Sequence, residues 1–234
     1  MLVRHLLFSK YRQGPLREAL EDTFGDRKLG ESTKRLVIPS LNLETGDVHI
    51  FKTAHDPHYE QDYKVRAVDV ALATAAAPTY FPTYWSAAGM PLVDGGMWAN
   101  NPTGMAVIEA IGVLRWRRDE ICVLSLGCTT EPLEVRWGAS QALGRAYWGL
   151  KVTDVFMRAQ SSASHGTAAV LVGHGNLLRI SPNVRRNRFS LDGVKEIRSM
   201  RGLGAEAARH ALPELRRACC ADHAEEFVPF HRLD

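Results

Sequence analysis

The sequence predicts an α/β protein with a partly parallel sheet, because short apolar runs alternate with segments of helical periodicity along its 234 residues. The clearest run is ICVLSL at 121–126, which Gly127 closes and which is typical of a strand buried on both faces of a parallel sheet. A hydrophobic fraction of 45% and a charged fraction of 24% are ordinary for a globular protein and exclude disorder and coiled coil. The net charge of +3 is too small to favour nucleic acid as the main partner.

Apolar spacing and turn residues place the elements of the first half of the chain. Leu16, Leu20 and Phe24 recur at helical spacing, and Pro15 suits the first turn of a helix. The turn residues ETGD at 44–47 separate two short apolar runs, as in a hairpin. We therefore expect helices over residues 16–24 and 66–77 and hairpin strands over 35–41 and 48–51.

The same signals continue through the second half. We expect strands over residues 90–93, 121–126 and 177–180, and helices over 102–114 and 204–217. A mostly helical stretch over 139–172 is expected to break around residues 161–166. The last helix is expected to kink or restart at Pro213, because proline lacks the amide hydrogen that a helix interior needs.

The cysteines and the apolar runs give an expectation of the cellular compartment of the protein. Cys219 and Cys220 are adjacent, and neither they nor Cys122 and Cys128 have the spacing of a metal knuckle, so we expect free thiols in a reducing compartment. The apolar start of the chain is interrupted by charge and has no cleavage site of a signal peptide. Prolines interrupt the longest uncharged run, at 70–93, which excludes it as a membrane-spanning helix. The expected localisation is cytoplasmic.

Asp94 is the strongest candidate for chemistry. It ends an apolar strand and is followed by Gly95 and Gly96, which allow a sharp turn and leave space beside the carboxylate. One interpretation is a general base at the mouth of a cleft. The other is a turn aspartate that accepts a hydrogen bond from the backbone two residues on.

The surroundings of Asp94 closely resemble the patatin-like phospholipase family in order and spacing. The resemblance rests on ATAAAPTYFP at 73–82, VDGG at 93–96, NNP at 100–102 and VLSLG at 123–127, and it extends over nearly the whole chain. It implies a three-layer α/β/α fold and hydrolysis of a lipid or phospholipid acyl ester without metal or organic cofactor. In that family the aspartate of Asp-Gly-Gly is one half of a serine–aspartate dyad, a role that falls on Asp94 here. Peripheral contact with a membrane is a further implication.

Two elements of the family pattern are missing from the sequence. No serine lies in a G-x-S-x-G elbow, and no glycine-rich turn of the oxyanion-hole type precedes it. The fold is therefore expected to be incomplete at its N-terminal side, with residues 1–107 and 108–234 forming the later parts of one catalytic domain. Three explanations remain open: a fragment of a complete lipase, a split protein with a partner chain that supplies the first part, and a catalytically inactive pseudoenzyme or regulatory half.

Other candidates have simpler interpretations. The segment HDPH at 55–58 is expected to be an exposed loop rather than a metal site. His165 and His174 are candidates for a triad with Asp94, but no serine elbow supports one. Arginines at 185, 186 and 188 suit a solvated loop or an anionic head group, and the aromatic residues at 137, 147, 148 and 156 suit core packing or an acyl pocket.

Overall fold

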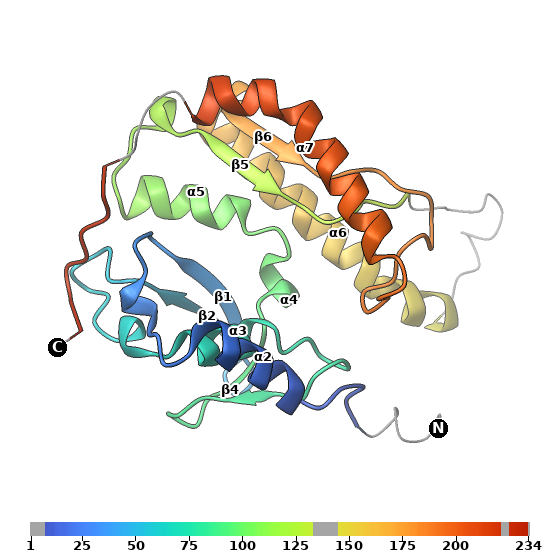
Figure 1. The fold of residues 1–234 in the computed structure, drawn as a ribbon, viewed down its shortest axis with the longest axis horizontal. Helices are drawn as coiled ribbons and strands as arrows, with labels where there is room; N and C mark the ends of the chain where they lie inside the picture. The colour runs from blue at the N-terminus through green and yellow to red at the C-terminus, as the bar shows by residue number, and fades with distance from the viewer. Residues whose placement is uncertain (1–7, 133–144, 221–224, 234) are drawn as a thin grey trace. The chain divides into compact units, whose positions relative to one another are not determined.

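The computed structural model describes residues 8–132, 145–220 and 225–233. These residues form two compact units. Unit 1 contains the chain up to Leu114 together with the residues from Glu225 onward, and unit 2 runs from Arg115 to Ala224. Figure 1 shows the elements of both units in chain order.

Unit 1 contains a four-stranded antiparallel sheet with the order β2-β1-β4-β3. Its strands are β1 (Val37–Asn42), β2 (Val48–Lys52), β3 (Tyr84–Trp85) and β4 (Pro91–Asp94). Its helices are α2 (Gly14–Phe24), α3 (Ala67–Thr74), α4 (Gly96–Ala99) and α5 (Thr103–Gly112). Short 3-10 helices lie at Leu29–Glu31 and Asp62–Lys64.

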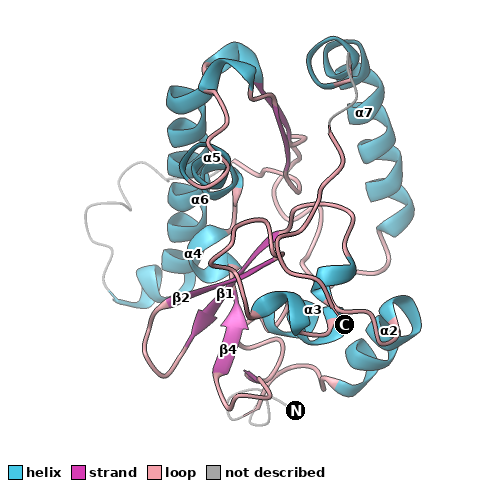
Figure 2. Ribbon diagram, turned by 90° about the vertical axis from the view of Figure 1, so that its left-hand side faces the viewer, coloured by secondary structure: helices cyan, strands magenta, loops and turns pink. Residues whose placement is uncertain are grey.

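The core of unit 1 lies where α3 packs on the sheet. Val68 and Leu72 of α3 are fully buried in one core with Leu92 of β4, and the small side chain of the buried Ala73 allows helix and sheet to approach closely. Helix α2 packs on this core through Leu16, Leu20 and Phe24. In Figures 1 and 2, α2 and α3 lie side by side beside the sheet. The C-terminal residues return to the same unit, where Phe230 N donates to Ala54 O over 2.8 Å.

Unit 2 is built on a parallel pair of strands, β5 (Val123–Leu126) and β6 (Leu177–Ile180). Two long helices, α6 (Arg145–Val172) and α7 (Ile197–Cys219), pack on this pair, and the views in Figures 1 and 2 place them on opposite faces of it. Short 3-10 helices occur at Arg118–Glu120 and His174–Asn176. A strand, a crossover helix and a parallel strand are the unit of α/β proteins, so the predicted α/β class is confirmed.

Most predicted elements are present, and four predictions about them are wrong. Helix α6 continues through residues 161–166 without a break, because the buried Ala168, Ala169 and Val172 hold its C-terminal part in place. Helix α7 begins seven residues earlier than predicted and does not restart at Pro213, which lies inside it. Helix α3 ends at Thr74 rather than at residue 77. Strand β5 is not buried on both faces, since the side chain of Leu126 is 70% exposed.

The prediction of free thiols is wrong for Cys122 and Cys219. Cys122, just before β5, and Cys219, at the end of α7, form a disulfide across 97 residues of sequence. Cys128 and Cys220 are free and exposed. Sequence spacing gives no sign of this pair, because only the packing of α7 on β5 brings the two residues together. No helix within the described ranges is long and apolar enough to cross a membrane.

Candidate functional site

Asp94 is the last residue of β4, at the point where the chain leaves the sheet. Its register partner on β1 is Ser40, and its backbone amide donates to Ala76 O over 3.1 Å. Ser40 is fully buried, and its hydroxyl donates to Val93 O over 2.7 Å. The backbone before the carboxylate is therefore fixed from β1 on one side and from the end of α3 on the other.

Gly95 and Gly96 each have a distinct structural role after Asp94. A Cβ on Gly95 would overlap the carbonyl oxygen of Pro39 and lie 2.7 Å from the Pro39 Cβ, so no side chain fits there. The Gly96 amide donates to Asp94 Oδ1 over 2.7 Å. A Cβ on Gly96 would lie 3.1 Å from the same oxygen. The two glycines thus let the turn close tightly around the carboxylate.

The carboxylate of Asp94 is half-buried and asymmetric. Oδ1 accepts the Gly96 hydrogen bond, whereas Oδ2 accepts no hydrogen bond from any residue that the structure describes. Burial raises the pKa of Asp94, and the hydrogen bond from Gly96 opposes this rise. The turn hydrogen bond expected for a structural aspartate is present, and it leaves one carboxylate oxygen and a more basic group for proton transfer.

The segment after the turn is tied back to β1. Trp98 of α4 donates its indole N–H to Ser40 O over 2.9 Å. The buried side chain of Asn101 then accepts hydrogen bonds from the Thr103 amide and hydroxyl at the start of α5. The helix therefore begins one residue later than the predicted Pro102, with Asn101 as its side-chain anchor.

A buried polar cluster around Glu109 of α5 was not predicted from the sequence. Lys52 Nζ lies 2.7 Å from Glu109 Oε2, and Oε1 accepts from Tyr59 OH over 2.9 Å and lies 3.0 Å from His55 Nε2. Lys52 also donates to Tyr59 OH over 2.7 Å, and the other ring nitrogen of His55 lies 2.9 Å from the Thr53 hydroxyl. The cluster connects β2 and the loop after it to α5.

The cluster corrects the interpretation of HDPH at 55–58 as an exposed loop. His58 is exposed, but the side chain of His55 is completely buried. Burial alone would raise the pKa of Glu109, yet hydrogen bonds from Lys52, His55 and Tyr59 lower it overall. The sequence signal that could have found the cluster is Glu109 itself, the one charged residue of TGMAVIEAIG.

The remaining candidates are described within their own units. His165 and His174 belong to unit 2, whereas Asp94 belongs to unit 1. Ser125 is buried on β5, where it accepts a hydrogen bond from Arg179. Residue 137 lies outside the described residues, and so does the side chain of residue 147. Trp148 and Phe156 of α6 are about half exposed, which contradicts core packing for these two.

The arginines at 185, 186 and 188 lie in a loop of unit 2. Arg188 donates to the Ser199 hydroxyl over 3.1 Å and stacks on Phe189 in an exposed loop. Within the part of the chain that the structure describes, no three histidine, cysteine or acidic side chains gather as a metal would require.

The fold and the site together define an α/β protein in which an aspartate at a strand end is followed by a tight glycine turn. Residues 2–107 match the family model described as patatin-like phospholipase. A cGAMP-activated phospholipase of Pseudomonas aeruginosa is 32% identical over 213 residues, which are 88% of this chain and 63% of that protein. Residues 2–107 therefore carry a match to the patatin-like phospholipase family, and most of the chain is similar to a phospholipase.

Other relatives match shorter parts. A cGAMP-activated phospholipase of Escherichia coli is 36% identical over 52% of this chain and 36% of its own length. Patatin-like protein 2 of Arabidopsis thaliana is 27% identical over 64% of this chain and 40% of its own length. The chain thus spans less than two thirds of each of these relatives.

Proposed function

We propose that Asp94 is the carboxylate of a serine–aspartate dyad that hydrolyses lipid acyl esters, with phospholipids as the first substrate class to test. One observation carries the proposal: Asp94 ends β4 on a tight Gly-Gly turn that engages Oδ1 and leaves Oδ2 without a hydrogen bond from the described residues. The family match supports it, because Asp94 and the turn lie within residues 2–107, which match the family model.

In the proposed reaction, Asp94 takes the proton of a serine hydroxyl while the serine oxygen attacks the ester carbonyl. The departing alcohol takes the proton, and a water molecule then repeats the sequence on the acyl-serine and releases the fatty acid. The raised pKa of Asp94 favours this role, because a general base works best when its pKa approaches the working pH.

The printed sequence contains no G-x-S-x-G elbow, so the proposal concerns a protein in which such an elbow accompanies these residues. The polypeptide 1–234 by itself is expected to hydrolyse neither p-nitrophenyl esters nor phospholipid vesicles, since both nucleophile and oxyanion donors are needed. Turnover by 1–234 that Asp94→Asn abolishes would instead indicate a different nucleophile.

A test of catalysis by Asp94 needs a protein that also contains the G-x-S-x-G elbow and the oxyanion donors. We suggest translating the DNA upstream of Met1 and that of neighbouring open reading frames, and assaying the protein that contains a G-x-S-x-G. In it, Asp94→Asn should lower kcat by about 10²–10⁴, the typical contribution of a general base. Asp47→Asn, in the exposed hairpin turn, is the matched control and should leave kcat unchanged. A catalytic role for Asp94 would be refuted by equal kcat values in the two variants.

A non-catalytic binding or regulatory module is the competing function. It would be supported by stop codons upstream and by the absence of esterase activity in any co-expressed pair. Because three of the matched relatives are named as cGAMP-activated phospholipases, cGAMP is the first activator to add in either assay.

A further inference from the structure

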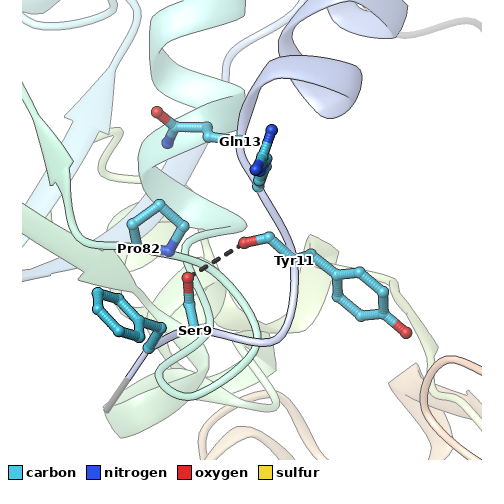
Figure 3. Close-up of a pocket in the computed structure, with 6 residues that line it drawn as sticks. Ser9, Tyr11, Gln13 and Pro82 are labelled. Carbon is cyan, nitrogen blue, oxygen red and sulfur yellow. Dashed lines mark hydrogen bonds between the residues drawn. The ribbon is translucent and has the colours of Figure 1, made fainter. Parts of the chain in front are cut away.

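A surface of unit 1 is formed where residues 8–13 lie along residues 79–82, and we call it the Phe8/Pro82 surface. Lys10 N donates to Thr79 O and Tyr11 N donates to Tyr80 O, each over 2.8 Å. Phe8, Ser9, Tyr11, Arg12, Gln13 and Pro82 line an open pocket of about 490 Å³ between the two segments. Figure 3 shows Ser9, Gln13 and Pro82 around this pocket.

Aromatic side chains are concentrated on this surface. Phe8 is 67% exposed, and Tyr11 lies with ring centroids 6.5 Å from Tyr80 and 5.8 Å from Phe81. In Figure 3 the ring of Tyr11 points away from Ser9 and Pro82, so it extends the surface beyond the pocket. Trp85, three residues after Pro82, is 65% exposed. Tyrosine and tryptophan rings with one apolar and one polar end favour the boundary between lipid and water.

The charge of the surface has one sign. Lys10 Nζ lies 5.5 Å from the ring centroids of both Tyr11 and Tyr80, and Arg12 is exposed and forms no ion pair with any described residue. Residues 8–13 and 77–88 contain no aspartate or glutamate. Basic groups beside exposed aromatic rings are complementary to an anionic lipid head-group layer above an apolar phase.

The surface is also joined to the candidate site through one loop. Thr79 has φ +72°, a conformation that a β-branched residue rarely adopts, and its carbonyl accepts the Lys10 hydrogen bond. Ala76, three residues earlier, accepts the backbone hydrogen bond of Asp94. A lipid layer in contact with this surface would therefore lie against the loop that supports Asp94.

We propose that the Phe8/Pro82 surface is a peripheral docking surface for anionic phospholipid bilayers, with Phe8 inserting among the acyl chains and Lys10 and Arg12 contacting head-group phosphates. This inference deepens the proposed function, because it states how a lipid phase would be brought to the Asp94 turn. Binding itself needs neither a nucleophile nor Asp94.

The test is sedimentation of the full 1–234 chain with vesicles of phosphatidylcholine and with vesicles that also contain phosphatidylglycerol. Wild type should bind the anionic vesicles more tightly. Each basic residue near an anionic leaflet contributes about five-fold in affinity, so Lys10→Gln/Arg12→Gln should weaken binding by about 25-fold. Phe8→Ser should weaken it by about ten-fold, through loss of a partly inserted ring.

The matched control is Lys34→Gln/Arg201→Gln, which removes the same charge from two other exposed positions and should keep wild-type binding. All variants should melt as the wild type does, because the changed side chains are exposed. The proposal is overturned if wild type does not bind, if both double variants lose binding equally, or if Phe8→Ser abolishes a concentration-dependent dimer instead. Asp94→Asn should bind vesicles normally, so a failed dyad and a failed docking surface give different results.

Discussion

Replacing Glu109 by glutamine isolates the energetic role of the buried cluster, because the change removes one negative charge and almost no volume. The carboxylate has Lys52 on one oxygen, at 2.7 Å, and Tyr59 and His55 on the other, at 2.9 and 3.0 Å. A glutamine amide places a nitrogen donor either against Lys52 or against Tyr59 and His55. At least one existing hydrogen bond must therefore be lost along with the charge.

The expected cost follows from burial. The side chains of Lys52 and Glu109 are 16% and 10% exposed, so water cannot readily replace the missing partner. Breaking a buried ion pair by removing one member typically costs about 3–5 kcal/mol. Because Lys52 keeps its hydrogen bond to Tyr59, we expect a loss of about 3 kcal/mol in the free energy of unfolding, at the lower end of that range.

Urea unfolding followed by circular dichroism measures this loss. The control is Glu18→Gln on the exposed face of α2, which should change stability by less than about 0.5 kcal/mol. The double variant Lys52→Met/Glu109→Leu removes both charges and should recover part of the loss, since apolar replacements of buried ion pairs are often neutral. Recovery is incomplete because Tyr59 and His55 lose Glu109 as a partner.

The pH dependence of the free energy of unfolding is a second measure of the same cluster. The pKa of Glu109 is lowered on folding, so its stabilising contribution is complete above the ordinary value of 4.5 and is lost as pH falls through the folded-state pKa. Burial lowers the pKa of Lys52, but hydrogen bonds to Glu109 and Tyr59 raise it overall. Its contribution is therefore present below 10.5 and is lost as pH rises further. The reasoning is refuted if Glu109→Gln unfolds within about 0.5 kcal/mol of wild type at neutral pH.

Three further outcomes are expected. Gly95→Ala should cost about 2 kcal/mol in urea unfolding because its Cβ overlaps the Pro39 backbone, whereas Gly112→Ala, which meets nothing within 4 Å, should be neutral; equal effects would contradict the packing argument. Burial raises the pKa of Asp94, so the protein is more stable with this carboxyl neutral, and that stability is lost as pH rises through the folded-state pKa. The melting temperature of Asp94→Asn should therefore equal or exceed that of wild type near neutral pH. A lower melting temperature would contradict a cost of burying the charged carboxylate. Thiol titration of the unfolded, unreduced chain should find two reactive thiols, and a count of four would show that Cys122 and Cys219 are not bonded.

Elements with clear boundary signals could be predicted from the sequence. Strand β6 was predicted over 177–180, as it is observed, and β4 within one residue, because turn residues flank both apolar runs. The hairpin of β1 and β2 follows from ETGD at 44–47 in the same way. The start of α7 was missed because none of its residues is buried, so apolar spacing does not mark where it begins.

The candidate site was predictable in part. The Asp94 turn is apparent from its own tripeptide, since the roles of both glycines are local. The Glu109 cluster was not, because its members come from β2, the following loop and α5, and residues 52 and 109 meet only in the folded chain. Pro57 correctly indicated a loop after β2, but burial of His55 depends on α5 and on side chains distant in sequence.

The clusters around Asp94 and Glu109 have a common mechanical consequence. The chain that follows Asp94 is attached to the β1–β2 hairpin at two points: Trp98 bonds to Ser40 of β1, and Glu109 bonds to Lys52 of β2. A turn held only by its own hydrogen bond could open at the cost of that bond, about 1 kcal/mol. With both attachments, displacement of Asp94 also breaks the hydrogen bond of a half-buried indole and a largely buried ion pair. The position of the carboxylate therefore also depends on residues that do not touch it, and loosening of α5 by Glu109→Gln should appear at the Asp94 turn as faster hydrogen exchange of the Gly96 amide.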